Sequence, residues 1–380
     1  MSRLLALCPD LIIYSSIHLL ISYKKIQFFC KNLKFITFNR SNTLAILIGC
    51  SGSTGSSLLK TILNRHSQLF AGPEAGLFAF PQVYDNWEAN KHQLLTTIKT
   101  DAWQLRKGMN LLQPAFGWEE RALQQLIQTS TTFQAFVPAF FKHTLQQENK
   151  QYWVAKTPAN AIGMTAFLQH FPAGKAIQTV RNPYDTITSL MARGMNVYQA
   201  TAYYIFNTAA ATANHKHQRY YHLKYEDLVA KPRETLRQLF DFLALNFEPE
   251  ILIAKHEKRA EPTAMKGWKH EETAAVKASS VGRFSTLSKE EKALIHSAFS
   301  GFKISQSYQE KWEIPFNSGA ELCAVLGYDY IPGEVGKHCL QLKKYLWKDR
   351  LSRVKHGFWW QFFDYVGRGI RGFQFPEKRG

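Results

Sequence analysis

The sequence has few cysteines and lacks a long apolar run. Its five cysteines stand apart, without the Cys-x-x-Cys spacing of zinc and redox motifs. An odd, dispersed set of this kind excludes a disulfide framework and a cysteine-based metal site, so we expect no metal and a reducing, cytoplasmic compartment. The apolar run from Leu11 to Tyr23 is too short to cross a bilayer, and no signal-peptide cleavage site is evident.

Acidic residues are also scarce. The 380 residues include 47 Lys and Arg against 29 Asp and Glu, which gives a formal net charge of +18. Such a charge attracts polyanions, anionic lipid surfaces or phosphorylated small molecules. No nucleic-acid-binding module is recognisable, so we expect no nucleic-acid partner. A basic protein associated with a membrane surface remains an alternative, and its binding would weaken steeply with salt.

The composition predicts a folded chain with two distinct ends. Residues 1–42 form an N-terminal extension in which lysines follow the apolar run, so weak membrane association is an open alternative. Residues 43–300 form the main domain, and 77–150 show helix-period apolar positions that predict a helical insert. Residues 301–380 predict a basic, aromatic-rich helical extension. Packing of its aromatic side chains on the domain is favoured over binding at a membrane interface.

Strand-like and helix-like segments alternate through the main domain. We expect strands at 44–50, 153–155, 176–180 and 220–225, and helices at about 56–66, 158–170, 183–193, 197–215 and 232–245. This alternation predicts an α/β fold, with a central, mainly parallel sheet covered on both faces. In such sheets the ligand lies at the carboxyl ends of the strands, and polar clusters follow four of these strands.

The loop after the first strand is rich in glycine and serine. It leads into a predicted helix, so its backbone N–H groups and the helix dipole would meet at one point and favour a phosphate-like anion. An ordinary glycine-rich turn is the alternative. The loop is not a Walker A motif, because five residues separate Gly49 from Gly55 and Ser56 follows instead of Lys. A magnesium-dependent nucleotide hydrolase is therefore disfavoured.

Four motifs occur in the order and spacing typical of one enzyme family. They are the loop at 52–59, Arg-Asn-Pro-Tyr-Asp-x-x-x-Ser at 181–189, Tyr-Glu-Asp-Leu at 225–228, and Gly-Arg-Phe at 282–284 followed by Leu-Ser-Lys-Glu-Glu. Together they resemble the sulfotransferases that use 3′-phosphoadenosine-5′-phosphosulfate (PAPS), in particular the carbohydrate and protein-tyrosine type. The resemblance covers about 44–300.

The resemblance implies a P-loop-like, three-layer α/β/α fold and transfer of a sulfuryl group from PAPS to an acceptor hydroxyl by in-line displacement. The product would be adenosine-3′,5′-bisphosphate, and a glycan acceptor is weakly favoured. Glu74 would be the general base and Lys156 the cation near the transferred group. The implied nucleotide-binding residues are Gly52, Ser53, Thr54, Gly55, Ser56, Ser57, Arg181, Ser189, Tyr225, Ser280 and Arg283.

The first loop departs from the family pattern at one position. The family usually has Arg or Lys where this chain has Ser53, and that side chain normally contacts the 5′-phosphosulfate. A catalytically silent homologue that binds PAPS or a glycan is therefore an alternative. His66 is the next candidate for the base, although its position at a helix end favours a packing role.

Overall fold

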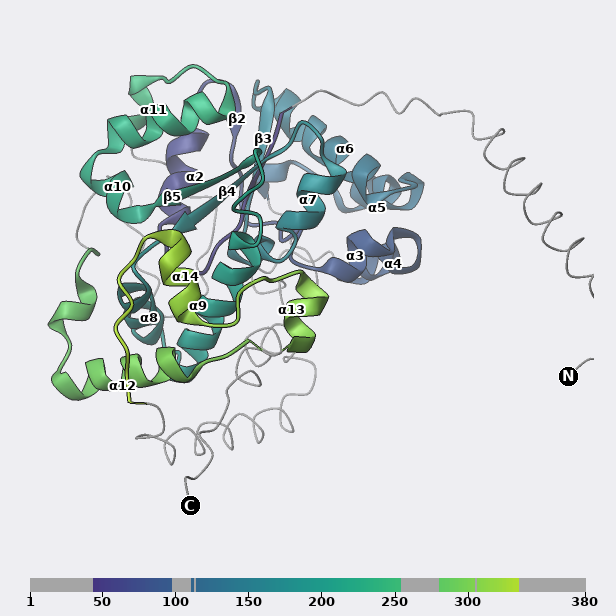
Figure 1. Ribbon diagram of the computed structural model, residues 1–380. Helices are drawn as coiled ribbons and strands as arrows, with labels where there is room; N and C mark the ends of the chain where they lie inside the picture. The colour runs from purple at the N-terminus through teal and green to yellow at the C-terminus, as the bar shows by residue number, and fades with distance from the viewer. Residues whose placement is uncertain (1–43, 98–110, 113, 254–279, 305, 335–380) are drawn as a thin grey trace, which may run out of the picture. The chain divides into compact units, whose positions relative to one another are not determined.

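Five parallel strands form a single sheet in the order β2-β3-β1-β4-β5 (Figure 1). The computed structural model describes residues 44–97, 111–112, 114–253, 280–304 and 306–334. Within them the strands are β1 Ala45–Ile48, β2 Leu69–Phe70, β3 Tyr152–Lys156, β4 Lys175–Val180 and β5 Tyr220–Lys224. The sheet confirms the prediction that the first, fourth and fifth of these segments are strands of one mainly parallel sheet.

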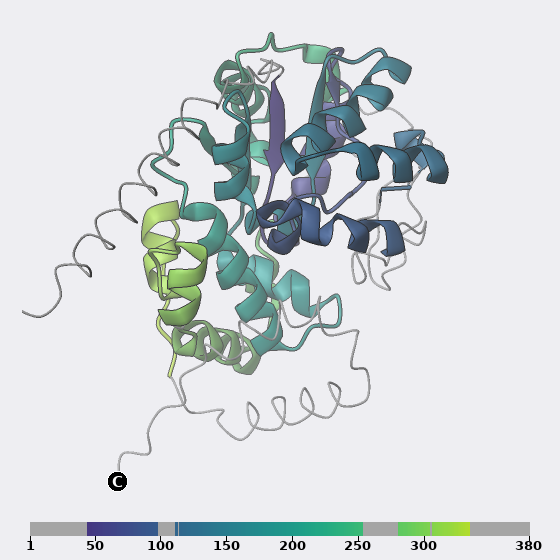
Figure 2. The same cartoon turned by 90° about the vertical axis from the view of Figure 1, so that its right-hand side faces the viewer.

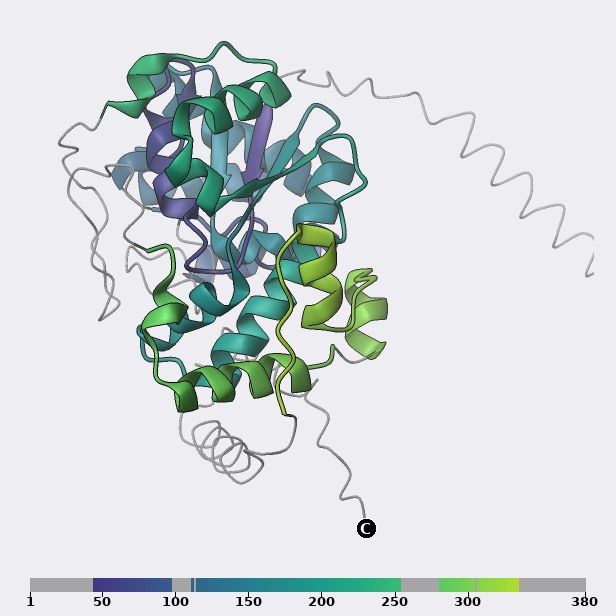
Figure 3. The same ribbon diagram turned by 60° about the vertical axis from the view of Figure 1, so that its left-hand side comes forward.

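Helices cover both faces of the sheet. The helices α2 (Ser56–Asn64), α10 (Tyr225–Ala230) and α11 (Pro232–Leu243) contact strands from one face, whereas α6 (Phe133–Gln147), α7 (Met164–His170) and α9 (Val197–Thr212) contact them from the other. Figure 3 brings α11 and α2 forward, and Figure 2 shows α6 in front of the sheet. The three-layer α/β/α prediction is confirmed.

The alternation of side chains along β1 explains the two apolar layers. Ile46 and Ile48 join the cluster that contains the apolar faces of α2 and α11. Ala45 and Leu47 join the opposite cluster, which contains the phenylalanines of α6. Because successive side chains of a strand point to opposite faces, an unbroken apolar strand serves both layers.

The other helices fall between β2 and β3, between β4 and β5, or after β5 in the chain. They are α3 (Pro81–Asp85), α4 (Trp87–Thr97), α5 (Glu120–Thr129), α8 (Pro183–Met191), α12 (Lys289–Gly301), α13 (Gln306–Trp312) and α14 (Gly319–Leu326). Short 3₁₀ helices occupy Pro114–Phe116, Pro158–Ala161, Pro249–Leu252 and Arg283–Thr286. Helices α3 to α6 all fall between β2 and β3, where the sequence predicts the helical segment.

The segment after α12 packs into the same apolar cluster as α9. Phe302, Phe316 and Leu322 are buried there.

The predicted membrane-associating parts, residues 1–42 and most of the C-terminal extension, lie outside the described residues. No helix in the described ranges combines the length and the apolar character needed to span a bilayer.

Two local predictions are wrong. The helix expected over 158–170 is interrupted, because Asn160 N and Gly163 N donate to carbonyls three residues earlier and form a 3₁₀ turn. Gly163 also lies so close to the Phe78 carbonyl oxygen that a Cβ there would be 2.2 Å from it. Tyr225, which we expected to end a strand, instead begins α10.

Phe141 tests whether the α6 layer and the sheet share one core. Its ring stacks on Trp153 of β3 with centroids 4.6 Å apart, and its side chain is 1% exposed. We expect Phe141→Ala to lower the free energy of unfolding by about 3–5 kcal/mol, measured by denaturant titration. Ile253→Ala is the control, because Ile253 is 58% exposed. Equal losses for both variants would contradict the shared core.

Candidate active site

The glycine- and serine-rich loop is fixed between β1 and α2 by backbone and hydroxyl hydrogen bonds. Gly49 N donates to Ile177 O at 3.1 Å, and Cys50 N donates to Pro158 O at 3.0 Å. The Thr54 hydroxyl donates to Ser51 O at 2.9 Å and lies 2.8 Å from the Thr179 hydroxyl. The loop is therefore attached to the strands on both sides of β1.

The loop turns into α2 through left-handed backbone at Ser53 (φ +68°) and Gly55 (φ +86°). A Cβ at Gly55 would lie 2.4 Å from the Tyr225 ring, so this position needs glycine for space as well as for φ. Gly55 is also the N-cap of α2 and offers no capping side chain. The first N–H groups of α2 thus face the loop without a side-chain acceptor at the cap, as in anion-binding helix ends.

Lys156 ends β3 and is 2% exposed. Its ammonium donates to the Ser57 hydroxyl at 3.1 Å and to the carboxylate of Glu74. Ser57 belongs to the first turn of α2, and Glu74 follows β2. The carboxyl ends of two neighbouring strands and the amino end of α2 therefore bring a cation and a carboxylate together beside the loop.

Arg181 follows β4 and is also 2% exposed. Its guanidinium donates to Ser53 O at 3.0 Å and to Ser280 O, and it lies over the Tyr225 ring at 5.2 Å. Burial lowers the pKa of Arg181, while Asp185 at 3.7 Å acts in the opposite direction. A cation that is desolvated in this way favours an anionic ligand at its open side.

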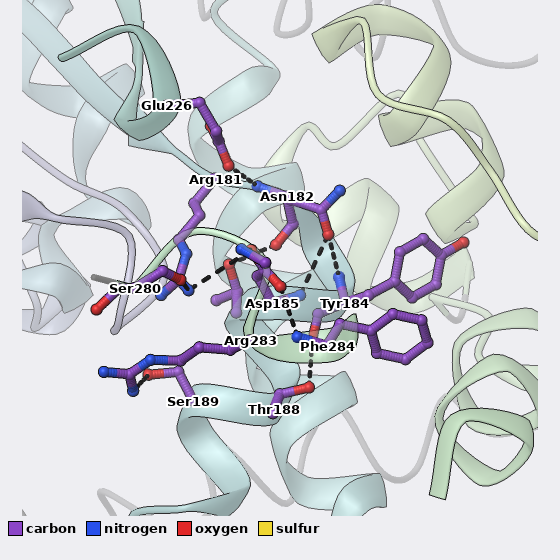
Figure 4. Close-up of polar contacts among 12 residues, drawn as sticks. Arg181, Asn182, Tyr184, Asp185, Thr188, Ser189, Glu226, Ser280, Arg283 and Phe284 are labelled. Atoms are coloured by element: carbon purple, nitrogen blue, oxygen red, sulfur yellow. Dashed lines mark hydrogen bonds and ion pairs between the residues drawn. The ribbon is translucent and has the colours of Figure 1, made fainter. Parts of the chain in front are cut away.

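Asp185 joins α8 to the loop that carries Arg283. Its two carboxylate oxygens accept from Gly282 N at 2.7 Å and from Phe284 N at 2.8 Å (Figure 4). The held loop places Arg283 so that its guanidinium donates to the Ser189 hydroxyl at 3.3 Å. Asp185 thus has a structural role, because it ties the first turn of α8 to the 282–284 loop.

The predicted site residues form contacts at the carboxyl edge of the sheet and on the adjoining α8. Beside the loop, Lys156 contacts Ser57 and Glu74, and Arg181 contacts Ser53, Ser280 and Tyr225. On α8, Ser189 contacts Arg283.

His66 is elsewhere, at the far end of α2. Its Nδ1 accepts from Gln68 N at 3.1 Å, its Nε2 lies 3.0 Å from Asn246 O, and its ring stacks on Phe240. Both ring nitrogens are therefore engaged, which supports the packing role.

Two buried polar atoms at the site have no hydrogen-bond partner in the part of the chain that the structure describes. They are the Ser53 hydroxyl oxygen and Arg181 Nε. One belongs to the anion loop and the other to the neighbouring guanidinium. Buried polar atoms are normally satisfied, so these two mark a place suited to the oxygens of a ligand.

The sequence analysis missed two residues near the site. Arg193 is four residues after Ser189, a helical spacing that would have indicated the same face of α8. Tyr203 is on α9, and a Cβ at Gly52 would lie 3.3 Å from its ring, so the ring packs against the loop. No motif marks Tyr203, because its proximity to the loop arises only from the packing of α9.

Comparison with known proteins decides the family. The model of the sulfotransferase family matches residues 45–249, more than half of the chain, and the match includes the loop, Glu74, Lys156 and Arg181. The chain belongs to the sulfotransferase family. This confirms the resemblance seen in the sequence, and it makes the protein a sulfotransferase enzyme. A comparison with curated proteins gives no significant match.

Solved structures similar to this sulfotransferase include two sulfotransferase domains. The domain of the olefin synthase from Synechococcus PCC 7002 has 19% identity and a TM-score of 0.44, covering 76% of this chain and 95% of its own. The domain from the curacin biosynthetic pathway has 23% identity and a TM-score of 0.42, covering 76% and 98%. Sulfotransferase STF9 from Mycobacterium avium has 15% identity and a TM-score of 0.31, covering 55% and 65%.

The role of Asp185 in this sulfotransferase can be tested by amide hydrogen exchange. We expect Asp185→Asn to speed exchange at Gly282 and Phe284 by roughly 10–100-fold, because their hydrogen bonds to a charged acceptor are lost or weakened. Exchange would be followed residue by residue by NMR. Glu321→Gln is the control, because it alters a carboxylate that accepts from Asn317 N at 3.2 Å and from the Ser318 hydroxyl at 2.9 Å. Unchanged exchange in Asp185→Asn would contradict the anchoring role.

Proposed function

We propose that the protein transfers a sulfuryl group from PAPS to an acceptor hydroxyl, with Glu74 as general base. The observation that carries this proposal is the contact of the Glu74 carboxylate with the Lys156 ammonium, which also donates to Ser57 beside the glycine- and serine-rich loop. A base and a cation at the amino end of α2 are the two groups that an in-line displacement at sulfur requires.

The donor would bind across the carboxyl edge of the sheet. The loop amides of 53–57, with the amino end of α2, would hold the 5′-phosphosulfate. Arg181, Ser189 and Arg283 would hold the 3′-phosphate, and Tyr225 would contact the nucleotide. The Ser53 hydroxyl and Arg181 Nε, both buried without a protein partner among the described residues, support this assignment.

The reaction forms a bond between the acceptor oxygen and sulfur and breaks the bond between sulfur and the bridging oxygen of the donor. Glu74 takes the proton of the attacking hydroxyl. Lys156 stabilises the charge that develops on the bridging oxygen, which leaves as part of adenosine-3′,5′-bisphosphate. In the described structure Lys156 contacts Glu74, so donor binding would draw the ammonium toward the sulfonate and leave the carboxylate for the hydroxyl.

The acceptor is a second part of the proposal. The net charge of +18 favours an acidic acceptor, and a glycan is weakly favoured. The helices between β2 and β3 would shape the acceptor side, because Glu74 precedes them and Lys156 follows them in the chain. We assign residues 43–300 to the catalytic domain, because this range contains all the proposed site residues, from Gly52 to Arg283.

Ser53 favours one other function, that of a silent homologue that binds the nucleotide without transfer. Ser53 occupies the place where the family usually has Arg or Lys, and its backbone is left-handed at φ +68°. In the active-enzyme proposal, Lys156 and the loop amides supply the positive charge that Ser53 lacks.

Glu74→Gln separates catalysis from binding. We expect turnover to fall by on the order of 10²–10⁴-fold, because a positioned base contributes about that much. Affinity for adenosine-3′,5′-bisphosphate should stay nearly unchanged, since the carboxylate binds the acceptor proton and not the nucleotide. Transfer of labelled sulfate from PAPS onto sugar, peptide-tyrosine, phenol and lipid acceptors measures turnover. Glu234→Gln, which changes an exposed carboxylate on α11, outside the helices assigned to the acceptor, is the matched control.

Two results would contradict this account. Full activity of Glu74→Gln would place the base elsewhere. A wild-type protein that binds the nucleotide but transfers to no acceptor, and that gains transfer on Ser53→Arg, would establish the silent homologue instead.

A further inference from the structure

Three residues lie one turn apart on one face of α8 and of the turn that ends it. Asp185, Ser189 and Arg193 are spaced by four residues, and positions i and i+4 of a helix share a face. Asp185 holds the 282–284 loop, and Ser189 accepts from Arg283. Arg193 therefore lies one turn beyond Ser189, which is assigned above to the 3′-phosphate, on the same face.

The end of α8 fixes the backbone of Arg193. Gly194 has φ +96°, and its N–H donates to Met191 O at 2.9 Å. Met195 N donates to Leu190 O at 3.3 Å. This pair of bonds is the Schellman pattern, which keeps the last turn helical up to the glycine. Arg193 is thus held in register with Ser189.

The surroundings of Arg193 are positively charged. Burial, together with Arg283 and Arg181, lowers the pKa of Arg193 to about 10, while Tyr203 acts in the opposite direction. A Cβ at Gly52 of the anion loop would lie 3.3 Å from the Tyr203 ring, so Tyr203 packs against that loop. Arg193 therefore lies near both the Arg283 side of the site and, through Tyr203, the loop side.

We propose that Arg193 is a third guanidinium of the donor site, and that with Arg181 and Arg283 it selects nucleotides that carry a 3′-phosphate. This inference rests on the proposed function. Three like charges gathered on one held surface repel one another in the protein alone, and a dianion placed among them relieves that repulsion. Charge-assisted bonds from guanidinium groups to phosphate are also among the strongest polar contacts.

The test compares adenosine-3′,5′-bisphosphate with AMP, which lacks only the 3′-phosphate. Calorimetry on the full chain gives the ratio of the two dissociation constants for the wild type, Arg193→Gln and Arg193→Lys. We expect Arg193→Gln to weaken the bisphosphate by roughly 10–100-fold and to leave AMP nearly unchanged. Arg193→Lys should weaken the bisphosphate less than Arg193→Gln does, because lysine keeps the positive charge but lacks the planar guanidinium. Arg121→Gln, an exposed arginine on α5, controls for the loss of one charge.

Thermal unfolding without nucleotide separates this role from a structural one. A base whose pKa is lower in the folded state destabilises the fold at neutral pH, where it is charged in both states. Arg193→Gln should therefore leave the Tm unchanged or raise it, whereas loss of a structural arginine would lower it. If the wild type binds AMP and adenosine-3′,5′-bisphosphate with equal dissociation constants, the proposed donor is wrong. If the wild type strongly prefers the bisphosphate and Arg193→Gln keeps that preference, only this inference is wrong. A raised KM of Arg193→Gln for the acceptor would then assign Arg193 to the acceptor.

Discussion

Two buried cations at the carboxyl ends of β3 and β4 are the constraint on which the site depends. Lys156 ends β3 and Arg181 follows β4, and these strands flank β1 in the sheet. Both side chains are 2% exposed. A buried charge is costly unless it is paired, so each has a carboxylate beside it, Glu74 for Lys156 and Asp185 for Arg181. The loop after β1 lies between these two pairs, and a ligand held there meets positive charge on both sides.

The two pairs serve different purposes in the account. Asp185 is committed to its neighbours, since both of its oxygens also accept backbone N–H groups from the 282–284 loop. It holds the geometry of the loop that carries Arg283. Glu74 is the more exposed carboxylate, with 24% of its side chain accessible, and it contacts Lys156. An accessible carboxylate beside a buried cation suits a group that must exchange a proton with an incoming hydroxyl.

Most of the fold could be predicted from the sequence, because the strands are short apolar runs and the helices show regular periodicity. The errors occur where a tertiary contact decides the backbone. The close approach of Gly163 to Phe78 interrupts one helix, and Tyr225 begins a helix in a position that places its ring over Gly55. The site residues follow motifs at strand ends, so sequence could group them. Arg193 required the register of α8, and Tyr203 required the packing of α9 against the loop, which no local pattern encodes.

The central claim is that the carboxyl edge of the sheet recognises a nucleotide with phosphates at both the 5′ and 3′ positions. The loop lacks the lysine of a Walker motif, while Arg181 contacts the loop at Ser53 O and Arg283 contacts Ser189 on α8. Calorimetric titration of the wild-type protein with adenosine-3′,5′-bisphosphate and with ADP tests this directly. The account predicts that the bisphosphate binds at least about tenfold more tightly, a difference of ~1.4 kcal/mol. Equal or tighter binding of ADP would contradict it.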